Sequence, residues 1–219
     1  MQDSGKNYDR LSWLYDGVAQ RYSGGQIQAL KTSQIGELQR GDRVLYAGVG
    51  GGEDAVLAAR HNVVLTVLDA SPLMLEQAAL KFQAAGVEDS IEVICSDILK
   101  HERPAYYDVI VANFFLNIFS ESKMQVVLAH LATMLKPGGK ILIGDFSYPD
   151  GWLATRTLQR TYYYLSMFTF WLFGGTPLHP IYDYPQFFAA VDLRTLSVKH
   201  FKVNALFPAS FATITALKT

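Results

Sequence analysis

The chain has 219 residues, of which 50% are hydrophobic and 18% are charged, and its net charge is −1. This length suits one substantial domain, and the composition is that of a chain with a large hydrophobic core. The near-neutral charge argues against a nucleic-acid partner. The single cysteine, Cys95, excludes an internal disulfide, and we expect it to be a small core residue. The polar N-terminus does not resemble a secretory signal, so we expect a cytoplasmic protein.

Residues 1–40 are expected to form a helical cap, with a second helix over 26–39 after the Gly24-Gly25 break. Strands and helices then alternate through a core at 41–148. Apolar runs predict strands at 43–48, 63–69, 91–97, 107–113 and 140–146, and helical periodicity predicts helices at 53–61, 71–86 and 124–135. This order indicates the α/β class, with a Rossmann-like, doubly wound and mostly parallel sheet.

The last third of the chain departs from this alternation. Residues 149–195 are expected to form an insert that contains an aromatic helical stretch, a loop at 174–185 and a short helix near 186–192. Residues 196–219 predict a C-terminal antiparallel hairpin added to the sheet edge. We therefore expect residues 1–219 to be a single domain.

The densest glycine cluster, "LYAGVGGGEDA", follows the first predicted strand. It is not a dinucleotide fingerprint, because Glu53 stands where GxGxxG requires its third glycine, and no Lys-Ser/Thr pair follows to make a P-loop. Glu53 and Asp54 would repel a pyrophosphate at the start of the next helix. The pattern instead suits a nucleoside with an amino-acid tail and a cationic centre, approached closely by the backbone of Gly48, Gly50 and Gly52.

Acids follow the next two predicted strands, where ligands of doubly wound sheets bind. Asp69, with Ala70 beside it, can accept both hydroxyl groups of a ribose. Asp97 can reach the exocyclic amine of an adenine, while Ile98 can lie against the ring. The alternatives are that Asp69 is only an acid at the start of a helix and that Asp97 caps the next segment.

Together these motifs resemble the class I S-adenosylmethionine-dependent methyltransferases over roughly residues 8–148. "LKPGGKILI" and "YDRLSWLYDGVAQRY" resemble the small-molecule branch, which includes ubiquinone and menaquinone methyltransferases. The resemblance implies S-adenosyl-L-methionine as the cofactor and implies no metal. The cofactor-binding residues implied are Tyr15, Tyr46, Gly48, Gly50, Gly52, Asp69, Ala70, Asp97, Ile98 and Asn113.

One position departs from the family pattern. The family usually carries an acid two residues before the first glycine, where this chain has Tyr46. That acid supports the ammonium group of the cofactor, whereas tyrosine is neutral near pH 7. Either Glu53 or Asp54 restores the missing charge, or the affinity for the cofactor is low, or a related form of the cofactor is bound.

The composition of the insert at 149–195 indicates what kind of substrate the protein binds. Residues 162–175 are rich in aromatic side chains but too short to span a bilayer, which requires about 20 apolar residues. A buried helix, a lid over an apolar substrate and an interfacial helix that contacts a membrane through 160–175 all remain open. In the following loop, His179 and Asp183 are the candidates for a catalytic base, and a rigid structural turn is the alternative.

The sequence thus predicts an enzyme that transfers a methyl group to a small, lipophilic acceptor such as a quinol, a lipid headgroup or a hydrophobic natural product. The alternative is a protein of the same fold that binds the cofactor or a lipid without methyl transfer, or that uses the cofactor for a different group transfer. The location expected is cytoplasmic, with a peripheral contact to a membrane.

Overall fold

The computed structural model describes residues 23–174, 179–204 and 207–219, and it describes the side chains of the longest helix only up to Leu165. The predicted N-terminal cap before residue 23, with the cofactor-binding candidate Tyr15, lies outside the described residues. The same holds for the aromatic side chains between residues 166 and 174.

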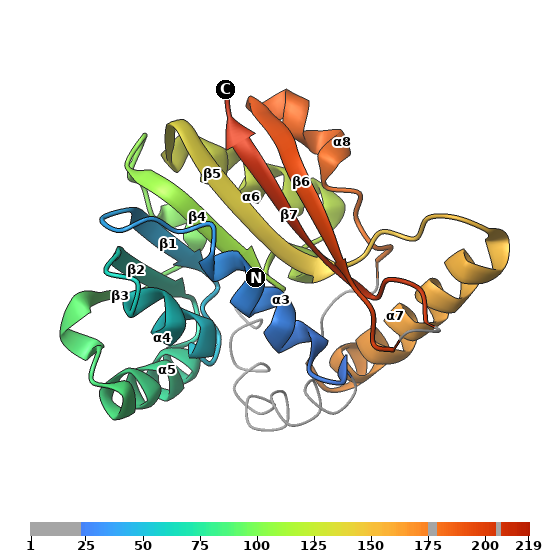
Figure 1. Cartoon of the computed structure of the whole chain (residues 1–219), viewed down its shortest axis with the longest axis horizontal. Coiled ribbons are helices and arrows are strands. Elements are labelled where there is room, and N and C mark those ends of the chain that lie inside the picture. Colours follow the sequence, from blue (N-terminus) through green and yellow to red (C-terminus); the bar gives the residue numbers. More distant parts are fainter. Residues whose placement is uncertain (1–22, 175–178, 205–206) are drawn as a thin grey trace.

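The described strands form one seven-stranded sheet in the order β3-β2-β1-β4-β5-β7-β6. The first five strands of the chain pair in parallel, whereas β7 pairs antiparallel with both β5 and β6. The sheet is therefore the mostly parallel, Rossmann-like one predicted, with a C-terminal hairpin on its edge (Figure 1). The strands are β1 Arg43–Ala47, β2 Val64–Asp69, β3 Ile91–Cys95, β4 Tyr107–Asn113, β5 Leu135–Phe146, β6 Leu193–Phe201 and β7 Phe211–Lys218.

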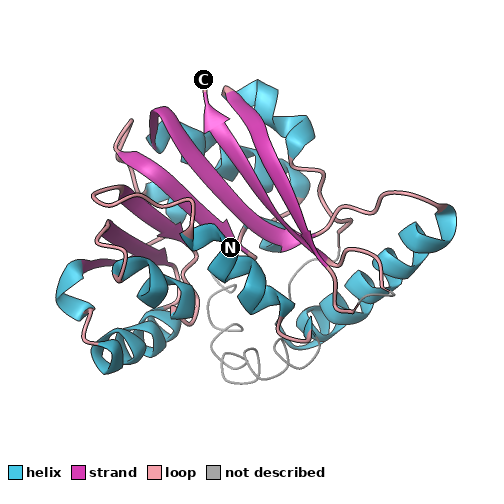
Figure 2. Ribbon diagram, in the orientation of Figure 1, coloured by secondary structure: helices cyan, strands magenta, loops and turns pink. Residues whose placement is uncertain are grey.

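Helices cover both faces of this sheet (Figure 2). One hydrophobic cluster joins the sheet to α3 Gln26–Ile35, α4 Glu53–Ala59 and α5 Pro72–Ala85. A second cluster joins the opposite face to α6 Glu121–Met134 and α8 Pro185–Phe188. The longest helix, α7 Leu153–Gly174, lies at the margin of the molecule (Figure 1). Short 3-10 helices are η1 Glu88–Ser90, η2 Ile98–Lys100, η3 Leu116–Ile118 and η4 Ala189–Val191.

Helix α5 forms where its end signals place it. The Ser71 hydroxyl oxygen accepts a hydrogen bond from the Met74 amide at 3.3 Å, and Pro72 occupies the first turn. Gly86 ends the helix with a left-handed backbone, at φ 63°. Each of these residues meets a local backbone requirement of a helix end, so the two ends can be predicted from the sequence.

The structure corrects several boundaries. Helix α7 begins at Leu153, well before the aromatic stretch, and β6 begins at Leu193 rather than at 196. Strand β5 begins directly after α6, because "KPGG" lies at a register shift within the strand instead of forming a separate turn. The expectation that Cys95 is buried is wrong: it is exposed, since β3 is the edge strand of the sheet.

A polar row crosses the sheet beneath α3. Asn113, Gly144 and Thr213 are register partners on β4, β5 and β7. Gln34 of α3 bridges them, donating to Thr213 Oγ1 at 2.8 Å and accepting from Asn113 Nδ2 at 2.8 Å. A Cβ at Gly144 would lie 2.3 Å from Asn113 Oδ1 and 2.5 Å from Leu30 Cδ2. Glycine is therefore required for α3 to sit against the sheet.

We expect Gly144→Ala to lower the free energy of unfolding by about 1–3 kcal/mol, the usual cost of an extra methyl group in a packed core. Urea denaturation monitored by circular dichroism measures this. The matched control is Gly36→Ala, because the nearest atom to a Cβ at Gly36 is 3.9 Å away. Equal stability of the two variants would contradict the assigned role of Gly144.

Candidate functional site

The glycine loop between β1 and α4 has the backbone shape that only glycine adopts freely. Gly48, Gly50 and Gly52 have φ values of 70°, 54° and 79°. A Cβ at Gly48 would lie 2.3 Å from the ring of Phe115, and one at Gly52 would lie 2.9 Å from the Ala78 Cβ. The glycines thus serve both the turn and its close packing against the segment after β4 and against α5, and the loop presents backbone rather than side chains.

Asp69, at the end of β2, is joined to this loop. Its carboxylate accepts hydrogen bonds from the Gly50 amide at 3.1 Å and from the Ser71 amide at 2.9 Å. The Asp69 carbonyl also accepts from the Ser96 amide at 3.0 Å, which brings the end of β3 alongside. The predicted glycine loop and ribose acid are therefore adjacent, and exposed Ala70 follows them.

The two residues predicted at the adenine end differ in exposure. Asp97 is exposed, and its carboxylate accepts from the Leu99 amide at 3.0 Å, so it caps η2. Ile98 is only 3% exposed and packs in the same hydrophobic cluster as Leu68. Asp97 therefore performs the capping role considered from the sequence and still lies at the carboxyl edge of the sheet.

Tyr46 is a core residue, 3% exposed, and its hydroxyl donates to the Asp54 carbonyl at 3.4 Å. Burial raises the pKa of the phenol well above its ordinary value, and the charge of Asp54 raises it further. Tyr46 is therefore uncharged at neutral pH. Tyr46 therefore does not provide the negative charge of the acid that the methyltransferases resembled by this sequence usually have at this position.

Of the two acids after the loop, Asp54 is the one beside Tyr46. Its carboxylate is 2% exposed, accepts from Asn113 Nδ2 at 3.0 Å and pairs with Lys31 Nζ at 3.4 Å. Glu53 is more exposed and pairs with Lys81, away from this cluster. Asn113, predicted at the cofactor site, thus lies next to a buried negative charge and a cation.

A second buried acid, Asp145, lies at the end of β5 and was missed by the sequence reasoning. Its Oδ1 accepts from Asn117 Nδ2 and from the Phe146 amide, each at 2.7 Å, and its Oδ2 accepts from the Tyr184 hydroxyl. Burial raises the pKa of the Asp145 carboxyl to about 6, although these hydrogen bonds oppose the rise. A strand-end acid is the same signal that identified Asp69, so the residue could have been found.

His179 belongs to this polar network and Asp183 does not. The His179 Nε2 contacts the Asn117 carbonyl, and its Nδ1 lies 2.9 Å from the Pro180 carbonyl and 3.4 Å from the Tyr163 hydroxyl. Its ring stacks on Tyr182 with a centroid separation of 4.6 Å. Among the described residues, the Asp183 carboxylate has no hydrogen-bond or ion-pair partner.

With this geometry established, comparison with known proteins identifies the domain. Residues 44–139 match the methyltransferase domain family. The 27-O-demethylrifamycin SV methyltransferase of Amycolatopsis mediterranei is 32% identical over 50% of this chain and 40% of its own length. A ubiquinone/menaquinone biosynthesis C-methyltransferase of Stutzerimonas stutzeri is 27% identical over 65% of this chain and 57% of its own. The chain thus spans less than two thirds of the length of both relatives.

Solved structures share the fold. Magnesium protoporphyrin IX methyltransferase from Synechocystis, with bound S-adenosylmethionine, has a TM-score of 0.63 and 12% identity over 88% of this chain and 78% of that one. The [4+2]-cyclase SpnF has a TM-score of 0.68 and 15% identity, with coverage of 98% and 95%.

These comparisons agree with the class predicted from the sequence: residues 44–139 match the methyltransferase domain family, and the chain resembles the quinone-biosynthesis methyltransferases. One of the solved structures that share the fold holds S-adenosylmethionine, the cofactor predicted from the sequence. No helix within the described residues is long and apolar enough to cross a membrane.

We expect Asp145→Asn to change how stability depends on pH. A carboxyl whose folded pKa is about 6 holds its proton more tightly than in the unfolded chain. Its stabilising contribution is therefore complete below the unfolded value of about 4 and is lost as the pH rises through 6, by on the order of 3 kcal/mol. Asparagine at position 145 can still form hydrogen bonds with the neighbouring polar groups, but it does not titrate, so the variant does not lose this stability as the pH rises.

The measurement is urea denaturation at pH 4 and pH 7, with Asp150→Asn, at an exposed acid, as the control. The variant at Asp145 should match the parent at pH 4 and exceed it at pH 7. The same pH slope in all three proteins would show that Asp145 does not titrate in this range.

Proposed function

We propose that this chain binds S-adenosylmethionine at the carboxyl ends of β1 to β4 and transfers its methyl group to a small, lipophilic acceptor. The observation that carries the proposal is the hydrogen bond between the Gly50 amide and the Asp69 carboxylate at 3.1 Å, which holds the glycine loop and the ribose acid together. The match of residues 44–139 to the methyltransferase domain family supports the same assignment.

The proposed contacts follow the edge of the sheet. The backbone of Gly48, Gly50 and Gly52 approaches the cofactor, Asp69 with Ala70 faces its ribose, and Asp97 with Ile98 flanks its adenine. Tyr15 is proposed on the same cofactor from the N-terminal segment. When bound, the cofactor supplies an electrophilic methyl group on a sulfonium.

The amino-acid end of the cofactor carries both an ammonium and a carboxylate group. We assign its recognition to Asp54, Lys31 and Asn113, which form one cluster beside Tyr46. Asp54 is assigned the negative charge that Tyr46 lacks, because its carboxylate accepts from Asn113 and its carbonyl accepts from the Tyr46 hydroxyl, whereas Glu53 makes neither contact. Tyr46 contributes by fixing the first turn of α4 through the Asp54 carbonyl.

The protein's own contribution to methyl transfer is to align the acceptor and exclude water. A base is required only where the acceptor must lose a proton. His179 and Asp183 are the candidates, in a segment tied to the end of β5 by the hydrogen bond from Tyr184 to Asp145. His179 is the better placed of the two, because its ring is held by Asn117 and Tyr182.

A lipophilic acceptor is supported by the aromatic composition of the insert and by a relative that is named for ubiquinone and menaquinone biosynthesis. The acceptor classes proposed are a quinol, a lipid headgroup or a hydrophobic natural product. We place the protein in the cytoplasm with a peripheral contact to a membrane.

A second candidate is a protein that binds the cofactor without transferring its methyl group, or that uses it for a different transfer. The neutral, buried Tyr46 favours this alternative, since the usual acid is missing. The fold does not decide the matter, because SpnF shares it and is named a cyclase.

We expect Asp69→Asn and Asp54→Asn each to weaken S-adenosylmethionine binding by roughly 10- to 100-fold, since a hydrogen bond to a charged group contributes about 1.5–3 kcal/mol. Isothermal titration calorimetry on the full chain measures this. Glu53→Gln is the matched control for Asp54, and Asp89→Asn, at an exposed acid in η1, is the control for Asp69. If Glu53→Gln weakened cofactor binding and Asp54→Asn did not, the negative charge that faces the cofactor would be that of Glu53 rather than that of Asp54.

Transfer of a radiolabelled methyl group from S-adenosylmethionine to a lipid extract tests the reaction itself. We expect label in the organic phase with the parent and a strong loss with Asp69→Asn, because its affinity for the cofactor is lower. Label that stays on the cofactor while calorimetry shows binding would favour the second candidate.

A further inference from the structure

The outer face of α7 carries large apolar side chains that the rest of the described chain does not cover. Leu153 is 80% exposed, Leu165 is 70% exposed and Tyr164 is 44% exposed. Trp152, directly before the helix, is 85% exposed. Large apolar side chains that are exposed together on one element mark an interaction site.

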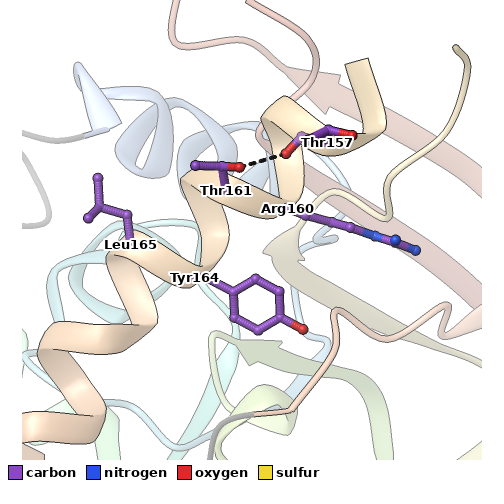
Figure 3. A pocket seen from close by; sticks show the side chains of 5 residues that line it. All are labelled: Thr157, Arg160, Thr161, Tyr164 and Leu165. Carbon is purple, nitrogen blue, oxygen red and sulfur yellow. Dashed lines mark hydrogen bonds between the residues drawn. The ribbon is translucent and has the colours of Figure 1, made fainter. Parts of the chain in front are cut away.

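Two of these side chains, Leu153 and Leu165, belong to one ridge of the helix, with two threonines between them. Leu153, Thr157, Thr161 and Leu165 follow each other at intervals of four residues, so they lie one above the other. The Thr157 hydroxyl donates to the Leu153 carbonyl at 2.8 Å. The Thr161 hydroxyl donates to the Thr157 carbonyl at 2.9 Å (Figure 3). Because these hydroxyl groups already donate hydrogen bonds within the helix, the free-energy cost of removing them from water is small.

The neighbouring ridge is cationic. Arg156, Arg160 and Tyr164 also follow at intervals of four residues. No Asp or Glu occurs between Asp150 and Asp183, so this segment of the sequence is purely basic. Arg160 and Tyr164 line a shallow hollow of about 550 Å³ together with Thr157, Thr161 and Leu165 (Figure 3).

The inner face of α7 is fixed, so the outer face cannot rotate into the core. Tyr163 is 1% exposed, and its ring lies 5.0 Å from that of Phe146. Gln159 donates to the Ala209 carbonyl at 2.7 Å. These contacts hold the helix at the margin of the molecule (Figure 1), while Leu153, Arg160 and Leu165 are exposed.

We propose that α7 docks the protein on an anionic lipid surface, with the leucines in the interface and the arginines on lipid phosphates. An apolar ridge beside a basic one is the pattern of helices that lie in a membrane interface. Arginine is suited to phosphate because its guanidinium donates in a fork. A second copy of the chain is a poorer occupant, since it would bring arginines against arginines.

This docking is independent of methyl transfer. The test is co-sedimentation of the full chain, without cofactor, with vesicles of phosphatidylcholine alone and of phosphatidylcholine mixed with phosphatidylglycerol. We expect binding to the anionic vesicles, and weakening of that binding by salt. Arg156→Gln and Arg160→Gln should each weaken it by about fivefold. Leu153→Gln with Leu165→Gln should weaken it by about tenfold or more per residue.

The matched control is Leu80→Gln, because Leu80 is 67% exposed on α5 and away from α7. It should leave vesicle binding unchanged, and circular dichroism should show that every variant is folded. Failure of the parent to bind anionic vesicles would overturn the proposal, and so would equal losses in Leu80→Gln and the α7 variants. A dimer in size-exclusion chromatography that Leu153→Gln abolishes would assign the face to a second copy instead.

Discussion

The structure depends on the burial of β1, β4 and β5 on both faces. Their apolar side chains alternate between two hydrophobic clusters, so helices must cover each side. Parallel strands with helical crossovers bring the loops that follow β1, β2, β3 and β4 to one edge of the sheet. The glycine loop and the strand-end acids are neighbours for this reason, although they are far apart in the sequence.

Most of this arrangement was predictable from the sequence. Each core strand is a short apolar run, and α5 is bounded by Ser71, Pro72 and Gly86, whose roles are local. The start of α7 was not predictable, because residues 153–161 lack the apolar periodicity by which a buried helix is recognised. "KPGG" was misleading, since a bulge within β5 and a turn require the same residues.

The candidate site was predicted in part, and the limit has a physical cause. Gly50 and Asp69 could be paired from motif order, and the structure joins them by a hydrogen bond. The partners of Asp54, and the connection of Tyr184 to Asp145, depend on side chains from distant elements that meet only after folding. Sequence spacing specifies which strand ends carry acids, whereas it does not specify which acids become buried.

The row of Asn113, Gly144 and Thr213 under α3 has a consequence for how this chain can vary. Leu30 and Asn113 together fill the space that a side chain at Gly144 would need, and Gln34 connects the strands on either side of it. A side chain at position 144 therefore requires a change at position 30 or 113. In a set of related sequences, residues 30, 34, 113, 144 and 213 should therefore covary as a group, with a larger residue at 144 accompanied by a smaller one at 30 or 113.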